Sequence, residues 1–229
     1  MYYTECRKWF FSLVCLLNAS LGFSQENFTA FWQPSVAVNY DLTSTYSHNF
    51  SVQNRNFIYE DETATLNTRQ VDVVHFSNLR IRENQSIALG ILYRFRDVFE
   101  NSSNELRLTQ QYNIQNRPLS VRYGHRLRSE QRISTIRTVH RFRYRFSLDF
   151  PLKGEKLDIG EPYLVGNLEN LLSVAKSLKP QYDLRLTAHI GWKLSQKTKV
   201  QIGSEYRFED YGQNLENVFF ILTNLNFSL

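Results

Sequence analysis

The sequence predicts an all-β protein, an antiparallel up-and-down transmembrane β-barrel of about 10 to 12 strands. First, apolar residues recur at every second position from Phe28 onward, the spacing of strands with one apolar and one polar face. Second, the alternating segments reach about the 9 to 11 residues that a tilted strand needs to cross a bilayer. Third, the composition is 42% hydrophobic and 14% aromatic with a mean hydropathy of −0.42, which excludes transmembrane helices and a disordered chain.

The first 24 residues have the organisation of a secretory signal peptide. Arg7 and Lys8 form a basic start, residues 9–17 form an apolar centre too short to span a bilayer, and small residues precede a cleavage site. We therefore expect a signal peptide at 1–24 and a barrel domain at 25–229. Both cysteines lie in the signal peptide, so the exported domain would contain no disulfide.

Eleven segments carry the alternating pattern. In one of the clearest, Phe142, Tyr144 and Phe146 alternate with Arg143 and Arg145. Single-chain bacterial barrels normally have an even number of strands, so we expect one strand to be missed or wrongly drawn near the N-terminus. In chain order, the segments are 28–40, 45–57, 71–81, 87–95, 105–114, 119–127, 142–150, 163–172, 184–194, 200–208 and 217–229.

The turns between these segments support the same sheet. A hairpin with an odd loop pairs residues of equal parity, and one with an even loop pairs residues of opposite parity. Odd turns at 83–85 and near Lys197, and a two-residue connection at Arg117 and Pro118, keep the apolar stripe on one side of the sheet. Residues 171–179 are interpreted as a loop that Pro180 ends.

Alternation alone does not say whether the apolar face looks toward a core or toward lipid. The polar face is rich in Arg and Glu but poor in Lys, whereas a solvated sheet face usually draws on Lys. An alternating aromatic strand also runs to Leu229 and resembles the assembly signal of outer-membrane barrels. Aromatic residues near the ends of the apolar stripes are the expected membrane-interface residues: Trp32, Tyr93, Tyr112, Tyr144, Trp192 and Tyr206.

These features favour the outer membrane of a Gram-negative bacterium. The expected partners are outer-membrane lipid and the barrel-assembly machinery during biogenesis, with no nucleic acid. The longer connections, near 59–68, 97–104, 173–181 and 209–216, fall on one side of the sheet and are expected to be extracellular, with the short connections opposite.

Arginine is concentrated in one part of the chain. Sixteen arginines fall between Arg55 and Arg145, where no lysine occurs. Arginine's planar fork suits fixed, enclosed pairing, so we expect the polar face to form a charged network in the lumen, with Asp149 and Asp183 among the partners. The predicted lumen network consists of Glu105, Arg107, Arg122, Arg126, Arg128, Glu130, Arg132, Arg141, Arg143, Arg145, Glu169, Arg185, Glu205 and Arg207.

The segment from His125 to Arg132, followed by Arg141 to Arg145, resembles the bacterial outer-membrane barrel family called domain of unknown function 2490. The same pattern includes Trp32, Glu105, Arg107, Gln110, Gln111 and Glu169, so the resemblance covers nearly the whole predicted barrel domain. It implies an outer-membrane barrel and supplies no established activity or catalytic residue.

The function expected from these observations is a structural envelope protein or a narrow pore. A salt-bridged plug that fixes the barrel is the first interpretation of the lumen network, and a basic constriction that selects anions is the second. The alternatives are an outer-membrane lipid-modifying hydrolase and a soluble periplasmic ligand-binding barrel.

The sequence predicts no catalytic set, metal site or cofactor, and it identifies no small-molecule ligand. His48, His75, His125 and His140 lie on apolar stripes. His189 lies on a polar face, but Ser204 on the neighbouring strand has the opposite parity and cannot reach it.

Overall fold

The computed structural model describes residues 28–60, 62–96 and 104–229, and the predicted signal peptide lies outside them. Every regular element in these ranges is a β-strand. Within the same ranges, no helix is long and apolar enough to cross a membrane.

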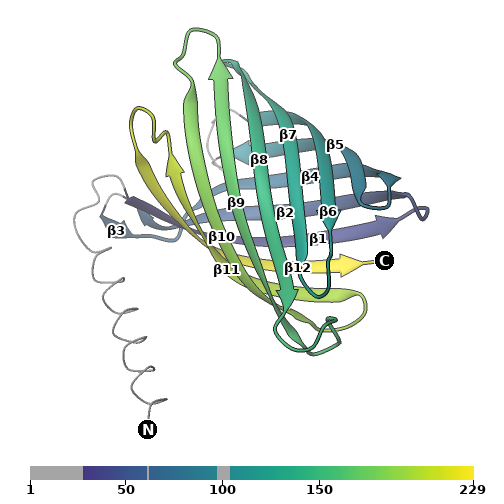
Figure 1. Cartoon of the computed structure of the whole chain (residues 1–229). Coiled ribbons are helices and arrows are strands. Elements are labelled where there is room, and N and C mark those ends of the chain that lie inside the picture. The colour runs from purple at the N-terminus through teal and green to yellow at the C-terminus, as the bar shows by residue number, and fades with distance from the viewer. Residues whose placement is uncertain (1–27, 61, 97–103) are drawn as a thin grey trace.

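Twelve strands form one sheet that closes on itself (Figure 1). Each long strand pairs with its neighbours in the sequence, apart from the closing pair β1–β12 and the two-residue strand β3, which pairs only with β2. The strands are β1 (Phe28–Asp41), β2 (Tyr46–Glu60), β3 (Thr63–Ala64), β4 (Thr68–Arg82), β5 (Gln85–Arg96), β6 (Glu105–Asn116), β7 (Arg122–Ser134), β8 (Thr138–Pro151), β9 (Pro162–Ala175), β10 (Gln181–Lys193), β11 (Thr198–Glu209) and β12 (Glu216–Ser228).

The barrel wall has an odd number of long strands, and its closure follows from that number. Eleven long strands that alternate in direction bring the first and the last into the same direction, so β1 and β12 pair in parallel, with Phe28 opposite Asn217 and Asn39 opposite Ser228. All other pairs are antiparallel. The fold class and the range of 10 to 12 strands are confirmed. The expectation of a missing strand is wrong, because a parallel pair closes the odd barrel.

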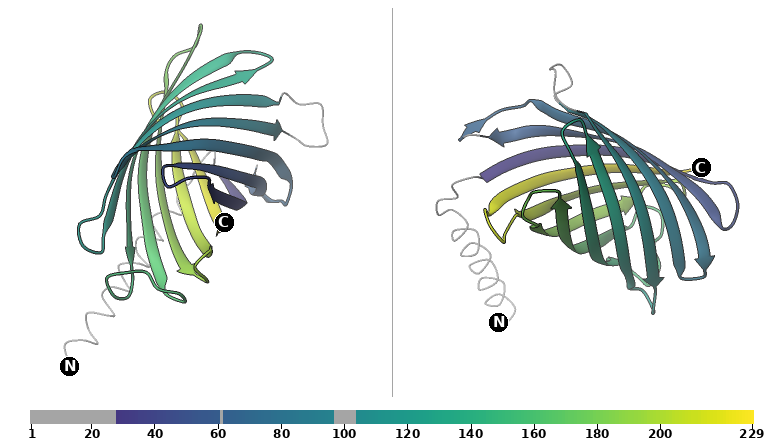
Figure 2. Two further views of the ribbon diagram at one scale, coloured as in Figure 1. Left: turned by 90° about the vertical axis from the view of Figure 1, so that its right-hand side faces the viewer. Right: turned by 90° about the horizontal axis from the view of Figure 1, so that it is seen from above.

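The two ends of the barrel are here called the Phe28 end and the Leu229 end, because β1 begins at one and β12 finishes at the other. The connections β2–β4, β5–β6, β9–β10 and β11–β12 lie at the Phe28 end, so the four connections expected on one side do share it. However, the connection at 152–161 lies at the Leu229 end, which contradicts the expectation that only short ones lie there. The walls are strongly twisted, so β6 to β9 cross the direction of β1 and β12 in the opposite wall (Figures 1 and 2).

The hairpin registers follow the parity argument. Residues of equal parity pair in β4–β5 and β10–β11, as in Leu79 with Ile87, and residues of opposite parity pair in β6–β7, as in Tyr112 with Leu127. The predicted start of the β7 strand at Leu119 is wrong. Leu119 has a φ of 56° and belongs to a turn, and the strand begins at Arg122.

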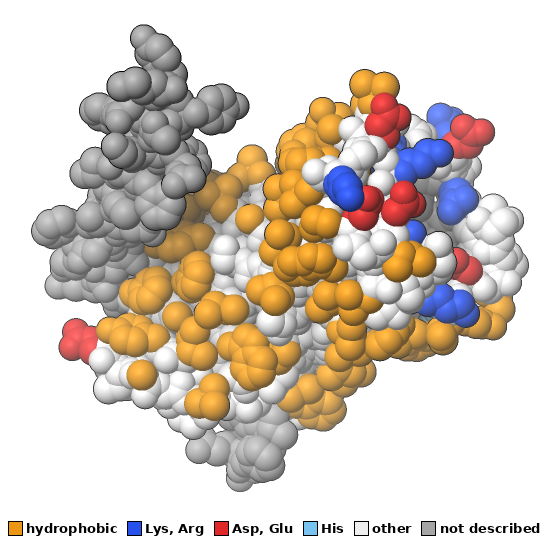
Figure 3. All heavy atoms as spheres, turned by 90° about the horizontal axis from the view of Figure 1, so that it is seen from below, with side chains coloured by type: hydrophobic (Ala, Val, Ile, Leu, Met, Phe, Trp, Pro, Cys, Tyr) orange, Lys and Arg blue, Asp and Glu red, His pale blue; other side chains and the backbone are white. Residues whose placement is uncertain are grey.

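Apolar side chains face outward and charged side chains face inward. Leu89 on the outer wall is 66% exposed, whereas Glu169 on the inner face is 2% exposed. Hydrophobic side chains cover much of the outer wall in Figure 3, and most of the charged side chains in that view gather on one side. Inside the barrel, a small apolar cluster of Phe31, Val218, Phe220 and Leu222 fills the region where β1 and β12 meet.

Candidate functional site

The buried centre of the lumen network is a set of three carboxylates, each shared by several arginines. Glu169 on β9 pairs with Arg126 at 3.1 Å, Arg143 at 2.6 Å and Arg145 at 3.0 Å. Arg143 also reaches Glu130 on β7 at 2.8 Å. One guanidinium therefore bridges two nearly inaccessible carboxylates, which fixes β7, β8 and β9 relative to one another.

The third carboxylate, Glu105 on β6, lies closer to the Phe28 end. It accepts hydrogen bonds from Arg107 on its own strand, from Arg132 at 2.9 Å and from Arg96 at 3.1 Å. Arg128 on β7 pairs with Glu130 at 3.3 Å. These contacts extend the ion pairs over β5 to β9. Their well-buried members are here called the Arg/Glu layer: Arg107, Arg128, Arg132, Arg143, Glu105, Glu130 and Glu169.

Two further groups of ion pairs lie on the inner face. Arg94 and Asp72 form a two-pronged contact, with nitrogen–oxygen distances of 2.7 and 2.6 Å. Glu205 pairs with Arg207 at 2.5 Å and accepts a hydrogen bond from Thr187 at 2.9 Å. Strand alternation explains both groups, because inward positions on each strand are the polar ones.

The structure brings most of the predicted network residues together but separates two of them from its centre. Arg122 lies at the Leu229 end, where it pairs with Asp149 at 2.6 Å and remains half exposed. Arg141 donates to Ser173 at 2.8 Å and lies 3.8 Å from Asp183, so it makes no direct contact with Glu169 or Glu130. Both side chains have the expected inward parity but lie nearer the barrel ends.

Sequence reasoning missed several residues of the inner face. Arg94 and Arg96 alternate with the outward-facing Tyr93 and Phe95 along β5, so they lie on the inner, polar face. The same alternation that predicted the other network residues could have identified both arginines. Arg55 stacks its guanidinium over Phe220, with 4.9 Å from the guanidinium carbon to the ring centre. That contact was hidden because the run from Val218 to Leu222 is apolar at every position.

Three cavities along the lumen are lined by the part of the chain that the structure describes. A central cavity of about 480 Å³ lies between a vestibule of about 660 Å³ at the Phe28 end and one of about 650 Å³ at the Leu229 end. Asn78, Gln111 and Arg126 line both the central cavity and the vestibule at the Leu229 end. The central cavity shares no described lining residue with the vestibule at the Phe28 end. Within the Arg/Glu layer, Glu105 and Arg132 line that vestibule, whereas Glu130 and Arg143 line the central cavity.

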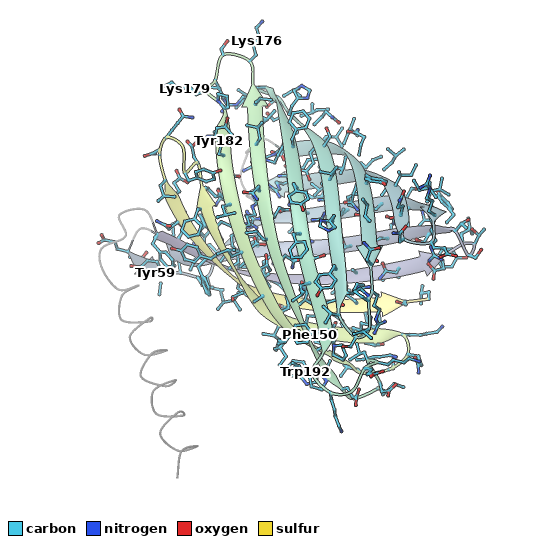
Figure 4. All side chains as sticks on the ribbon, in the orientation of Figure 1. Tyr59, Phe150, Lys176, Lys179, Tyr182 and Trp192 are labelled. Carbon is cyan, nitrogen blue, oxygen red and sulfur yellow. The ribbon has the colours of Figure 1, made fainter. Side chains whose placement is uncertain are left out.

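The predicted interface aromatics lie on the outer wall. Trp32 is 38% exposed near the Phe28 end, and Trp192 on β10 lies near the Leu229 end, the end toward which Phe150 on β8 also lies (Figure 4). Tyr93 and Tyr206 lie toward the Phe28 end, and Tyr112 toward the Leu229 end. Tyr144 differs from the expectation because it is the seventh residue of the 14-residue β8, where its hydroxyl lies 2.9 Å from the Nδ1 atom of His125.

The histidines do not form a catalytic arrangement with a serine in the described ranges. On the outer wall, the Nδ1 atom of His48 lies 3.0 Å from His75 and 3.5 Å from the hydroxyl of Ser77. One nitrogen thus faces both neighbours, whereas a general base needs one nitrogen for the nucleophile and the other for an orienting group. His189 faces the lumen and contacts Asn224 at 3.2 Å. No cluster of three His, Cys, Asp or Glu that could hold a metal occurs in the described residues.

Comparisons with known proteins identify a family. No curated protein matches the chain. Among solved structures, the siderophore receptor PirA from Pseudomonas aeruginosa aligns with a TM-score of 0.32 and 12% sequence identity over 77% of this chain and 34% of that chain, so the chain spans about a third of that receptor's length. A family model described as a protein of unknown function, DUF2490, matches residues 29–218. That range runs from the start of β1 into the first residues of β12, and the chain therefore belongs to the DUF2490 family.

Proposed function

We propose that the protein is an outer-membrane β-barrel of a Gram-negative bacterium, acting as a structural envelope protein or a very narrow pore. The observation that carries the proposal is the inverted distribution of polarity: an exposed apolar outer wall around a buried charged interior. A soluble barrel would place its apolar face inward, and a water-exposed apolar belt of this extent would promote aggregation. Membrane lipid would cover the outer wall, and the barrel-assembly machinery would insert the protein into the outer membrane.

The lumen supports a narrow or closed passage. A barrel of about 8 strands is filled by side chains and one of about 16 is a water-filled channel, so 11 long strands lie between these cases. The Arg/Glu layer occupies the space between two cavities, and Arg143 holds two carboxylates across it. Passage of a solute would require these ion pairs to open.

Location and fold are tested together by fractionation and gel mobility. The full chain expressed in a Gram-negative host should appear in the outer-membrane fraction, require detergent for extraction and migrate differently before and after boiling. Recovery in the aqueous periplasmic fraction would overturn the proposed location and favour a soluble ligand-binding barrel.

Planar bilayer recordings test the passage. We expect small or no conductance for the wild type, and any conductance should favour anions because arginines exceed carboxylates on the inner face. Arg143→Glu should change that selectivity or open the layer, whereas Lys156→Glu in the exposed connection 152–161 should leave conductance unchanged. A large conductance that Arg143→Glu does not alter would contradict the role of the layer.

A further inference from the structure

The central cavity carries more positive charge than its own carboxylates can balance. Nine arginines line it together with only three carboxylates, Asp72, Glu130 and Glu205. Arg94 already occupies both oxygens of Asp72, and Arg207 and Thr187 already use Glu205. Carboxylates behind the lining add Glu105 for Arg107, Glu169 for Arg126, Arg143 and Arg145, and Glu209 for Arg207, which makes six carboxylates for nine arginines. The remaining surplus of positive charge favours an anionic partner, because buried charge is costly without one.

Cross-strand neighbours add to this surplus. Arg126 lies directly opposite Arg145, Arg128 opposite Arg143, and Arg185 opposite Arg207. Like charges in directly opposite positions destabilise a sheet. One row across β7 to β11 reads Arg126, Arg145, Glu169, Arg185 and Arg207, so one carboxylate stands among four arginines and pairs with two of them, Arg126 and Arg145.

Several of these guanidinium groups also have unused hydrogen-bond donors. Arg185 is 8% exposed, makes no hydrogen bond to a described residue, and has its nearest carboxylate oxygens 3.8 Å away on Asp183 and Glu209. Arg55 has no carboxylate partner among the described residues and donates only to the neutral side chain of Gln33, at 3.1 Å. The Nε atoms of Arg126 and Arg143 are buried without a partner. The oxygen atoms of an oxyanion accept hydrogen bonds from guanidinium donors of this kind.

We propose that the central cavity is a binding site for a small oxyanion with two or more negative charges, of the phosphate or polycarboxylate class. This inference rests on the proposed barrel and deepens it by naming the ligand class of its lumen. A volume of about 480 Å³ lies within the range of small-molecule sites. The ligand would enter through the vestibule at the Leu229 end, since Arg126, Asn78 and Gln111 line both spaces.

The opposite side of the cavity suits the uncharged part of such a ligand. Asn39, Asn49, Ser51 and Gln53 on β1 and β2 line it with amides and a hydroxyl. Amides and hydroxyls both donate and accept, so they can bind the hydroxyl groups of an organic anion. The cavity therefore offers guanidinium groups from β5 to β8, β10 and β11, and mainly neutral polar groups, together with Arg55, from β1 and β2.

The first test is the thermal unfolding of the full chain in detergent micelles, with pyrophosphate and citrate as probes and sodium chloride at equal ionic strength as the reference. A ligand that binds only the folded barrel raises the unfolding temperature with concentration. We expect a saturable rise of a few degrees with either probe and none with chloride. A rise with pyrophosphate alone would assign the site to phosphates, and one with citrate alone to carboxylates. Equal responses to probe and chloride would overturn the proposal.

Variants distinguish a site from general screening. Arg185→Gln should preserve folding, because no hydrogen-bonded carboxylate loses its partner, and should weaken probe binding by about tenfold or more. Arg117→Gln removes the same charge from an exposed turn and should bind like the wild type. Wild-type affinity in Arg185→Gln and in Arg55→Gln would overturn the proposal.

The same preparations separate this inference from the proposed location. A protein that is extracted from membranes and is heat-modifiable, but does not respond to the anions, would remove only the binding site. A protein recovered in the aqueous fraction would remove the membrane location, and the anion titration on that soluble barrel would still decide whether the site binds.

Discussion

Glu169 shows how much of the lumen depends on a single side chain. It is 2% exposed and pairs with three arginines that belong to two neighbouring strands. The side chain of Arg143 is 9% exposed and those of Arg126 and Arg145 are 21% and 26% exposed, so their charges depend largely on nearby carboxylates for balance. The carboxylate is therefore the point at which β7, β8 and β9 are held together electrostatically.

Glu169→Gln should lower the free energy of unfolding by about 3 kcal/mol or more, because it leaves buried arginines without their shared partner. Urea unfolding in micelles, followed by tryptophan fluorescence, measures the change. Glu155→Gln in the exposed connection 152–161 is the matched control and should change stability by no more than about 0.5 kcal/mol. A stability loss as small as that of the control would show that lumen water already solvates these arginines.

At the scale of the elements, the alternation of apolar and polar residues predicts which side chains of a strand face inward and how neighbouring strands of a hairpin pair. The pairs Leu79–Ile87 and Tyr112–Leu127 follow from parity, and the inward position of Arg143 follows from its place between Phe142 and Tyr144. Ion-pair partners are harder to predict, because they depend on the register across several strands.

Closure is a property of the pair β1–β12 and is not encoded in either strand's alternation. The run from Val218 to Leu222 is apolar on both faces, so its sequence does not reveal that Phe220 points inward onto Phe31, with ring centres 5.0 Å apart. A β-bulge between Ala30 and Phe31 changes the inward face of β1 locally. The apolar run of β12 and the bulge of β1 both lie at the pair that closes the barrel. The sequence pattern therefore does not reveal this parallel closure, and the expected even number of strands is wrong for that reason.

The parallel closure predicts a specific cross-link. Ser35 and Asn224 are directly opposite each other, and their side chains are joined by a hydrogen bond of 2.6 Å. Ser35→Cys combined with Asn224→Cys should form a disulfide on oxidation, seen as a shifted band of the denatured chain that reductant removes. Ser35→Cys with Thr223→Cys is the control, since Thr223 lies on the other face of the wall. Cross-linking of the control pair alone would mean a different register.

At the scale of the whole molecule, the odd strand count places Phe28 and Leu229 at opposite ends of the barrel. Connection length then gives conflicting indications of orientation. The four connections β2–β4, β5–β6, β9–β10 and β11–β12 lie at the Phe28 end, but the ten-residue connection 152–161 lies at the Leu229 end. The connection 117–121 at the Leu229 end is also as long as 176–180 at the Phe28 end. Outer-membrane barrels have longer extracellular loops and short periplasmic turns, and the shared side of the four connections favours an extracellular Phe28 end. The central cavity would then open toward the periplasm.

Cysteine labelling on intact cells tests this orientation. Lys176→Cys, near the tip of the β9–β10 connection in Figure 4, should react with a membrane-impermeant maleimide on intact cells. Ser44→Cys and Lys156→Cys lie at the opposite end and should react only after the outer membrane is permeabilised. The wild-type chain is the control, since its two cysteines lie in the predicted signal peptide and should give no signal. Labelling of Lys156→Cys on intact cells, with Lys176→Cys protected, would mean that the single longest connection sets the orientation and that the arginine-lined cavity opens to the outside of the cell.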